Sequence, residues 1–354
     1  MDYQPILQAI RQEDAPAVLA TIASVKGHAY RKTGAAMLFR LQSGSIGSIS
    51  PGCLEADLLA RVPDVWRTGD MRRVDYNMNP DEDAIWGESV GCGGAISVML
   101  EPVRGHLWDC LTEAGRRMER GETTRLIREQ RGGLLHYRLE SGDAAESASE
   151  DPQFPRTLLV PRPPLLLFGA GEDAMPISRL AQEAGFRVIV ADWREGLLKR
   201  ERFPGAELVA GAPEAIIAAA GIRRGGYAVI GSHQAHRDSV MLAELIQLEM
   251  AYIGIIGSQR RIQLVVDGLD GSRLAPIHAP AGIRIGAEGP CEIAVSIVAE
   301  LIAVRSQRRA LRAKGGHGSE NRRHLFGSWI QQTNGRTQAV ARAFAGHYAR
   351  QPRA

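Results

Sequence analysis

The pattern of hydrophobic and polar positions in the first 140 residues predicts helices and strands in mixed order. Apolar residues recur at helical spacing over residues 3–11 and 108–119, and a third amphipathic helix follows the glycine turn at residues 50–54. Short apolar runs predict strands at residues 17–23, 35–39, 45–49 and 94–102, and a hairpin that joins residues 123–129 to 134–139. We therefore expect an N-terminal α+β domain over residues 1–140.

The pattern breaks at residues 141–163, which begin SGDAAESASEDPQFP and end in a proline-rich stretch. Such a polar segment buries too little apolar surface to order itself, so we expect a linker there. Beyond it, predicted strands begin near residues 165, 188, 207, 227 and 252 and alternate with helical stretches. This alternation predicts a Rossmann-like domain with a mainly parallel sheet over residues 164–306, so the chain as a whole is α/β.

The first strand, turn, helix and second strand of this domain carry a dinucleotide-binding fingerprint. Gly169 and Gly171 form the pattern G-x-G-x-x-A, in which Ala174 replaces the third glycine, and Asp192 follows at the spacing of a ribose-binding carboxylate. A helix that starts near Glu172 would present unpaired N–H groups and its positive dipole end to a phosphate. The unit predicts the fold, whereas binding of NAD(P) is a separate question, because folds do not fix functions.

Composition is that of an ordinary soluble protein, with 44% hydrophobic and 23% charged residues. The chain has neither a signal-peptide pattern nor an apolar run of about 20 residues, so we expect a cytoplasmic protein without a membrane partner. Its four cysteines lack CxxC spacing.

The C-terminal segment is strongly basic. From Arg305 onward it contains eleven Lys or Arg residues and one acid, Glu320. Few aromatics accompany them, which disfavours nucleic acid and favours a solvated, partly disordered tail at residues 307–354.

Two glycine turns of the N-terminal domain each carry a cysteine. Residues 50–55 bring Cys53 to the start of a helix, where a thiol becomes a better nucleophile or soft-metal ligand. Residues 90–94 place Cys92 among three glycines, immediately before a buried strand. Either cysteine alone is equally consistent with a small residue in a tight turn. Because both turns belong to one domain, we expect Cys53 and Cys92 to face one cleft.

Three further loops of the C-terminal domain carry candidate chemistry. His233 and His236, with Asp238, follow a strand and suit hydrogen bonding at the sheet edge better than a metal site, since no third strong ligand is apparent. Residues 257–261, GSQRR, suit a phosphate or carboxylate, or simply begin a surface helix. Residues 279–292 lead into a helix whose Glu292, Ser296 and Glu300 share one face, which is either solvated or lines a pocket.

In order and spacing, residues 8–305 resemble the xanthine dehydrogenase accessory factors of the XdhC/CoxI family. The matching segments of the N-terminal domain are SVKGHAYRKTGAAMLF, PGCLEADLL and GCGGAISVMLEP. Those of the C-terminal domain are LFGAGEDAMPISRLAQEAGFRVIVADWR, SHQAHRD, YIGIIGSQRR and APAGIRIGAEGPCEIAVSIVAELIA. The chain departs from the family where it has Pro51 before Gly52 and Cys53, and where it has Gly27-His28-Ala29-Tyr30. Pro51 lacks a backbone N–H, so contacts at this position differ from those of relatives.

The resemblance implies a factor that binds molybdenum cofactor, helps a cysteine desulfurase to sulfurate it, and delivers it to a molybdenum hydroxylase. The implied client is a purine-oxidising xanthine dehydrogenase, with carbon monoxide and aldehyde hydroxylases as alternatives, and we expect a homodimer. No catalytic residue is assigned, and Cys53 or Cys92 is the implied contact to molybdenum or sulfur. The implied cofactor-binding residues are Gly52, Cys53, Glu55, Gly91, Cys92, Gly93, Gly94, Gly169, Gly171, Ala174, Asp192, His233, Gly257, Ser258, Arg260, Gly282, Gly286 and Glu292.

Three functions therefore compete. The first is a maturation chaperone that binds a cofactor without turnover. The second is an NAD(P)-dependent oxidoreductase, which the fingerprint favours but which lacks an assignable hydride-transfer acid or base beyond His233. The third is a protein-interaction scaffold whose nucleotide fold binds nothing. The small molecules bound to the isolated protein would distinguish the three.

Overall fold

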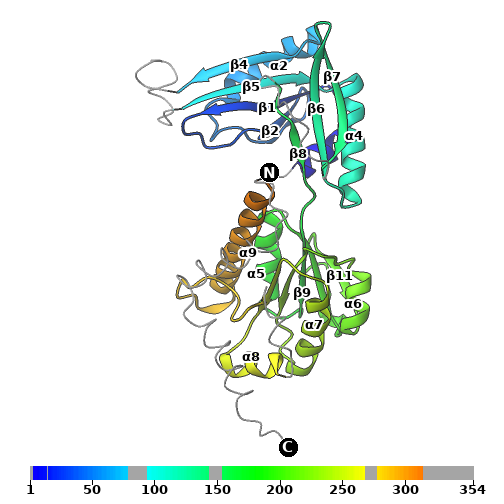
Figure 1. Ribbon diagram of the computed structural model, residues 1–354, viewed down its shortest axis with the longest axis vertical. Coiled ribbons are helices and arrows are strands. Elements are labelled where there is room, and N and C mark those ends of the chain that lie inside the picture. The colour runs from blue at the N-terminus through cyan, green and yellow to red at the C-terminus, as the bar shows by residue number, and fades with distance from the viewer. Residues whose placement is uncertain (1–2, 14, 79–93, 143–153, 268–276, 314–354) are drawn as a thin grey trace, which may run out of the picture. The chain divides into compact units, whose positions relative to one another are not determined.

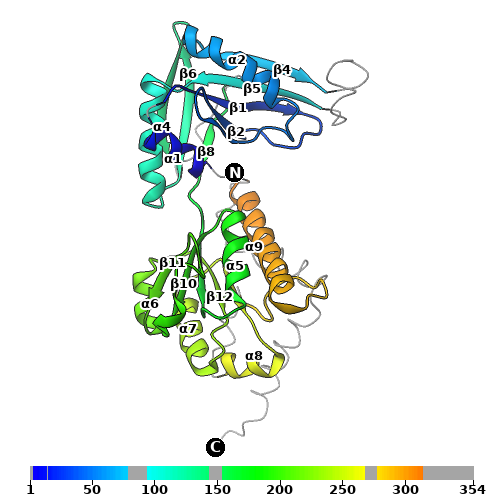
Figure 2. The ribbon, with the colours of Figure 1, turned by 180° about the vertical axis from the view of Figure 1, so that it is seen from behind.

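The computed structural model describes residues 3–13, 15–78, 94–142, 154–267 and 277–313. The chain divides into two compact units, residues 1–162 and 163–354 (Figures 1 and 2). Within the described residues, no helix is both long and apolar enough to cross a membrane.

A five-stranded antiparallel sheet forms the centre of the N-terminal unit, in the order β3-β2-β1-β5-β4. Its strands are β1 (Ala17–Lys26), β2 (Ala36–Arg40), β3 (Gly44–Gly47), β4 (Arg72–Asn77) and β5 (Ala95–Pro102). The hydrophobic pattern predicts all of them but β4. The exposed and buried residues of β4 alternate through a mostly polar segment, RRVDYN, so its strand character depends on pairing with β5.

Helices cover both faces of this sheet. On one face, Val18, Ala20 and Ile22 of β1 pack against α2 (Glu55–Thr68). On the other, Leu19 and Leu38 pack with α1 (Gln4–Gln12) and α4 (Gly105–Glu119). Because β1 is buried on both faces, its sequence is a continuous apolar run rather than an alternating one.

A second, three-stranded sheet has the order β7-β6-β8. The hairpin of β6 (Thr124–Arg131) and β7 (Leu134–Ser141) turns at Gly132 and Gly133, both at positive φ, as the sequence predicts. The third strand, β8 (Thr157–Leu159), falls within the segment expected to be a linker and pairs with β6. The two sheets are also joined by a fully buried, bidentate ion pair of Arg128 with Glu101, at 2.7 and 2.9 Å.

The difference at β8 has a physical reason. Its Leu159 is completely buried in the core, and Thr157 accepts a hydrogen bond of 2.8 Å from Arg128. Because the surrounding segment is polar and rich in proline, its composition gives no sign that these two residues are buried. The N-terminal unit consequently extends to Arg162 rather than ending near residue 140.

The C-terminal unit contains a six-stranded sheet in the order β11-β10-β9-β12-β13-β14, with every pair parallel. Since β9 is the first of these strands in the chain, the order is that of a Rossmann fold. The expected fold class is therefore confirmed. The strands are β9 (Pro164–Phe168), β10 (Arg187–Asp192), β11 (Glu207–Ala210), β12 (Tyr227–Ile230), β13 (Tyr252–Ile255) and β14 (Ile277–His278).

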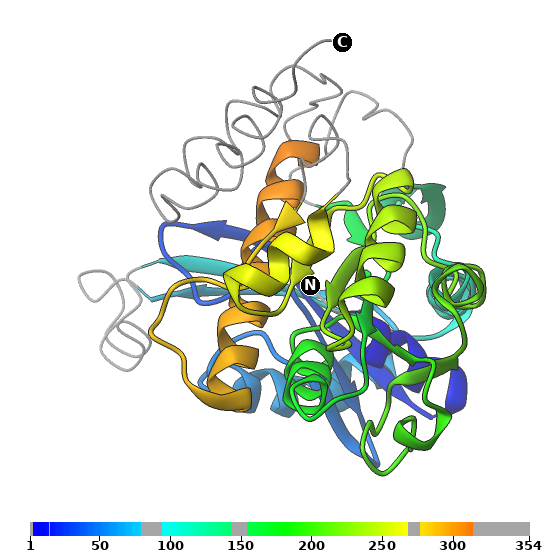
Figure 3. The same cartoon turned by 90° about the horizontal axis from the view of Figure 1, so that it is seen from below.

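Two hydrophobic clusters cover the two faces of this sheet. Helices α5 (Ala174–Glu183) and α9 (Gly289–Ala313) pack on one face. Helices α6 (Pro213–Ala219), α7 (Ala235–Gln247) and α8 (Gln259–Val266) pack on the other. The loops that leave the carboxyl ends of β9, β10, β12 and β13 lie together at one edge, and Figure 3 looks onto this edge, with α8 (yellow) in front. Ligands of Rossmann folds bind at this edge.

Candidate functional site

The glycine turn between β9 and α5 is built for close approach of the backbone. Gly169 has φ +115°, and a Cβ atom there would lie 2.6 Å from the carbonyl oxygen of Gly231 and from Cα of Ser232. Glycine is therefore required at this position. At Gly171, a Cβ atom would meet the His233 ring at 3.7 Å, an ordinary contact, so this glycine leaves room rather than avoiding a clash.

The turn presents hydrogen-bond donors at the start of α5. Within the described residues, no acceptor is found for the backbone N–H groups of Gly171, Glu172 or Asp173, and Ala174 begins the helix. Unpaired N–H groups at a helix start, with the positive end of the helix dipole, form an anion-binding surface. Ala174 itself is buried and packs in the core.

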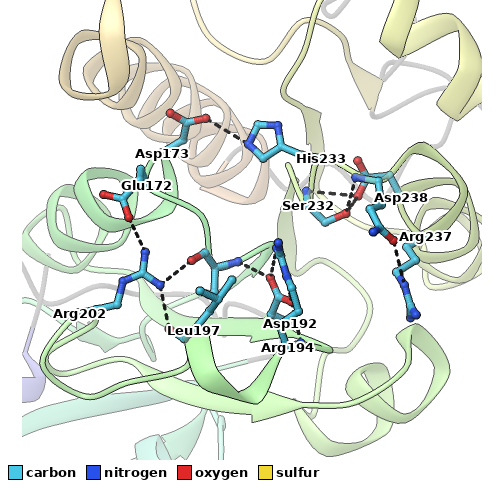
Figure 4. Close-up of polar contacts among 12 residues, drawn as sticks. Glu172, Asp173, Asp192, Arg194, Leu197, Arg202, Ser232, His233, Arg237 and Asp238 are labelled. Atoms are coloured by element: carbon cyan, nitrogen blue, oxygen red, sulfur yellow. Dashed lines mark hydrogen bonds and ion pairs between the residues drawn. The ribbon is translucent and has the colours of Figure 1, made fainter.

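Asp192, at the end of β10, is fully buried and already bonded within the protein (Figure 4). Its carboxylate accepts hydrogen bonds from the N–H of Ala170 at 2.8 Å and from the N–H of Arg194 at 2.9 Å, and it forms a bidentate ion pair with the Arg194 guanidinium. Burial raises the pKa of Asp192, but these donors lower it further than burial raises it. The carboxylate thus holds the glycine turn and Arg194 instead of facing a ligand.

Charged side chains surround the glycine turn. Arg202 pairs with Glu172 at 2.9 Å and donates to the carbonyl oxygen of Ala170 at 2.9 Å. His233 lies across the turn, where its Nε2 is 3.5 Å from Asp173 (Figure 4). His233 also has φ +64°, a conformation that non-glycine residues seldom adopt and that concentrates at functional sites. The acids of the turn are therefore each matched by a nearby basic group.

The loop after β12 is held by a buried carboxylate. Asp238 accepts hydrogen bonds from the N–H and hydroxyl of Ser232 and pairs with Arg261. Burial raises the pKa of Asp238 more than these partners lower it. Among the described residues, no three His, Cys, Asp or Glu side chains are grouped to hold a metal ion. Asp238 therefore acts here through hydrogen bonds and an ion pair.

The loop after β13 mainly starts α8. Gly257 has φ +152°, and a Cβ atom there would lie 2.6 Å from Cδ of Arg261. Ser258 caps the helix by accepting from the N–H of Arg261 at 3.4 Å, whereas the Arg260 side chain is exposed. Of the two arginines, Arg261 is thus committed to Asp238, and Arg260 is open to solvent.

The polar face of α9 binds the preceding loop. Glu300 accepts hydrogen bonds of 2.7 Å from both the Tyr252 hydroxyl and the N–H of Gly282, and its other oxygen lies 2.9 Å from Nδ1 of His278. Ser296 donates to the carbonyl oxygen of Ile283 at 2.6 Å. Ser296 and Glu300 are buried. At these two residues the face of α9 therefore contacts the preceding loop and neither meets solvent nor lines a pocket.

The two remaining predicted residues of this region lie at the surface. Glu292 is exposed and accepts from the N–H of Glu288 at 2.8 Å, which closes the first turn of α9. Gly286 is exposed at φ +72°, with open space where a Cβ atom would lie.

In the N-terminal unit, Cys53 occupies the turn that leads into α2. Its side chain is half-buried, and its Sγ lies 3.4 Å from the Ser50 hydroxyl. Glu55 accepts from the N–H groups of Ile49 and Ser50 at 3.1 and 2.7 Å and from the Ser50 hydroxyl. Glu55 thus holds the turn together, and Gly52, at φ +124°, has open space on its Cβ side.

Gly94, the residue before β5, lies at the end of the sheet where β1 and β4 end. A Cβ atom on Gly94 would lie 2.2 Å from the carbonyl oxygen of His28, so the chain leaving β1 requires glycine there. Strands β1, β3 and β4 end, and β2 and β5 begin, at this end of the antiparallel sheet, which also carries the turn with Cys53. Gly91, Cys92 and Gly93 lie outside the described residues, so a shared cleft of the two cysteines stays a prediction.

Several residues of these sites were not identified from the sequence. They are Ser50, Arg194, Arg202, Arg237 and Trp193. Ser50 and Glu55 are five residues apart and so lack the three-residue spacing of a capping box, which left their contact without a sequence signal. The arginines gave no such signal either. The partners of Arg202 are backbone atoms or lie 30 residues away, and a spacing of two residues does not by itself show that Arg194 pairs with Asp192.

Comparisons with known proteins cover both units. A family model for the XdhC Rossmann domain matches residues 165–301, and a model for the XdhC and CoxI family matches residues 10–77. The chain is 33% identical, over 334 residues, to a protein of Bacillus subtilis (strain 168) named as a probable xanthine dehydrogenase subunit. The match covers 86% of this chain and 98% of that protein.

Two further proteins are similar over most of the chain. The molybdenum cofactor insertion chaperone PaoD of Escherichia coli (strain K12) is 24% identical over 295 residues, which cover 82% of this chain and 83% of PaoD. A crystal structure described as a xanthine dehydrogenase from Bacillus halodurans matches with a TM-score of 0.78 at 31% identity, covering 87% of this chain and 97% of that one. The chain belongs to the XdhC and CoxI family.

Proposed function

We propose that this protein is a maturation factor that binds molybdenum cofactor and delivers it to a molybdenum hydroxylase, with xanthine dehydrogenase as the client. The observation that carries the proposal is a group of N–H donors at Gly171, Glu172 and Asp173 that have no acceptor among the described residues, at the ligand-binding edge of the Rossmann sheet. The cofactor is cargo here, and its phosphate is an anion of the kind that such donors bind.

The side chains present fit such a cargo. Gly171 leaves room at the turn, and Arg202 pairs with Glu172, one of the two acids that lie in the turn. The similarity to a molybdenum cofactor insertion chaperone over 82% of this chain supports the same cargo. The similarity to a protein named as a probable xanthine dehydrogenase component supports the client.

We assign the finer steps to the N-terminal unit. In this scheme a cysteine desulfurase supplies the terminal sulfur of the cofactor, and Cys53 contacts that sulfur or the molybdenum. The half-buried Sγ on an open glycine turn supports this assignment, because a soft sulfur ligand needs partial access. A homodimer and a cytoplasmic location stay predictions, which light scattering and cell fractionation would test.

The test is the state of the client enzyme in cells that lack this chain. We expect xanthine dehydrogenase polypeptide at its normal level, but with low activity per mole, low molybdenum and low cyanide-labile sulfur. Complementation with Arg187→Gln, which lies away from the turn, should restore all three quantities, and Gly171→Leu should restore none. Full client activity and sulfur without this chain would reject the proposal.

An NAD(P)-dependent oxidoreductase is the competing function, and the Rossmann strand order favours it. Against it, the carboxylate expected to bind the ribose is bonded within the protein. Steady-state turnover of NAD(P)H by the isolated protein with purines or aldehydes would favour this alternative over a maturation role.

A further inference from the structure

A cationic and aromatic cluster lies at the end of β10, beside the glycine turn. Trp193 follows Asp192 directly, and the guanidinium carbons of Arg194 and Arg237 each lie 4.5 Å from the centroid of its ring. Phe168, at the end of β9, supports the indole with its centroid at 6.2 Å. Cation–π contact holds both guanidiniums in place without neutralising them.

The two arginines come from different loops. Arg194 follows β10, whereas Arg237 lies in the first turn of α7, which follows β12. Because β10 and β12 flank β9 in the sheet, the cluster spans the point where the strand order reverses. This crevice is where ligands of doubly wound sheets bind.

The charge of this cluster is incompletely balanced. Arg194 is paired with Asp192, but Arg237 donates its Nε–H to the neutral amide oxygen of Gln234 at 3.3 Å, and no carboxylate of the described residues forms an ion pair with it. Asp192 is fully buried, so it cannot present its oxygens to the hydroxyls of a ribose. The end of β10 thus offers cations where the fingerprint anticipates an anion.

We infer that this cluster is a subsite for a phosphate monoester, with Arg194 and Arg237 as its ligands and Asp192 as the residue that positions Arg194. A phosphate monoester carries nearly two negative charges at neutral pH, and planar guanidiniums bind its oxygens in bidentate fashion. For a nucleotide ligand the inference is independent of the proposed function. For a pterin ligand it rests on the proposed function and places the phosphate of the cofactor at these arginines instead of at the glycine turn.

Two ligands carry this group: a 2′-phosphorylated adenine nucleotide and a pterin that bears a methyl phosphate. The test measures binding to the purified full-length protein by calorimetry, with NADP⁺, NAD⁺ and 6-hydroxymethylpterin monophosphate as probes. NADP⁺ and NAD⁺ differ only in the 2′-phosphate, so their ratio of affinities reports on this subsite alone.

If the natural ligand is a nucleotide, we expect NADP⁺ to bind at least about tenfold tighter than NAD⁺. If the natural ligand is a pterin, we expect the pterin phosphate to bind and the two nucleotides to have equal affinities. Arg237→Gln should abolish whichever of these is found, the preference for NADP⁺ or the binding of the pterin phosphate, and Arg237→Lys should retain part of it. Arg237 is chosen because Arg194→Gln would leave the buried Asp192 unpaired.

Arg187→Gln is the matched control. Arg187 also forms an ion pair, with Glu207 at 2.8 Å, but it begins β10 and so lies at the opposite edge of the sheet. Its loss should leave all affinities unchanged. The inference is overturned if no probe loses affinity in Arg237→Gln. It is also overturned if NAD⁺ binds as tightly as NADP⁺ and only Asp192→Asn weakens the binding of NAD⁺, because the ribose hydroxyls would then be the recognised group.

Discussion

Glu55 supports the turn that carries Cys53, and its removal should therefore affect stability. The Glu55→Ala variant leaves the N–H groups of Ile49 and Ser50 without their acceptor, at a cost of about 1–3 kcal/mol. For a unit of this size, about 2–4 °C is lost per kcal/mol. We expect the melting temperature of the N-terminal unit to fall by several degrees, as followed by circular dichroism. An unchanged melting temperature would mean that the turn does not need this carboxylate.

Cys53 should show the opposite behaviour, because its side chain is half-buried and contacts only the rim of the core. We expect Cys53→Ala to change the melting temperature by less than about 2 °C and to lower the amount of molybdenum cofactor that purifies with the protein. The amount is measured as pterin fluorescence after oxidation. Cys110→Ala is the control, since Cys110 lies in α4. Equal cofactor content in both variants and the wild type would remove Cys53 from the site.

At the scale of elements, the β9–α5 turn contains two glycines with different purposes. Gly169→Ala forces Cβ against the backbone of Gly231 and Ser232, so it should destabilise the Rossmann unit, whereas Gly171→Ala should preserve it. Gly171→Leu should retain far-UV circular dichroism but lose binding of pyrophosphate in calorimetry, because the larger side chain covers the N–H groups. Undiminished binding by Gly171→Leu would refute an anion site at this turn.

Helix α9 is tied to the loop before it by Glu300, and this connection should be sensitive to acid. Burial raises the pKa of Glu300, but His278, Tyr252 and Gly282 together hold it below its usual value. The stabilisation is therefore present above the unfolded pKa of about 4.3 and is lost as the pH falls through the lower, folded pKa.

We accordingly expect the melting temperature of the C-terminal unit to fall as the pH drops below about 4.3. In Glu300→Gln this fall should be shallower, and the melting temperature at pH 7 should be lower. The check is a series of thermal scans between about pH 3 and pH 7. Parallel profiles for variant and wild type would show that another group is responsible, with Asp192, whose pKa is also lowered, as the first candidate.

At the scale of the whole molecule, the chain contains separate hydrophobic cores in residues 1–162 and 163–354. Units with their own cores unfold as separate cooperative transitions. We expect differential scanning calorimetry to resolve two transitions, with Glu55→Ala lowering one and Glu300→Gln lowering the other. A single transition that both variants shift equally would show that the units unfold as one.

Local patterns were sufficient to predict most of the fold. The apolar run of β9, the glycine turn and the apolar run of β10 predict a Rossmann fold because each depends on neighbours in the chain. Only the structure shows that Gly169 and Gly94 are required because another part of the backbone passes close to them. Strands β4, β8 and β14 were missed. Polar residues dominate β4, whereas β8 and β14 are only three and two residues long, and pairing with β5, β6 and β13 makes them strands.

The sequence by itself determined the two-part organisation, the parallel C-terminal sheet and the family. Only the tertiary structure decided what each candidate residue contacts. Asp192 had the spacing of a ribose ligand, yet Arg194 and Ala170 occupy both of its oxygens. Arg237 gave no signal, yet it lies against Trp193, 44 residues earlier in the chain. The physical reason is that periodicity and turn chemistry act between near neighbours, whereas the bonding of a carboxylate or guanidinium depends on which groups folding brings to it.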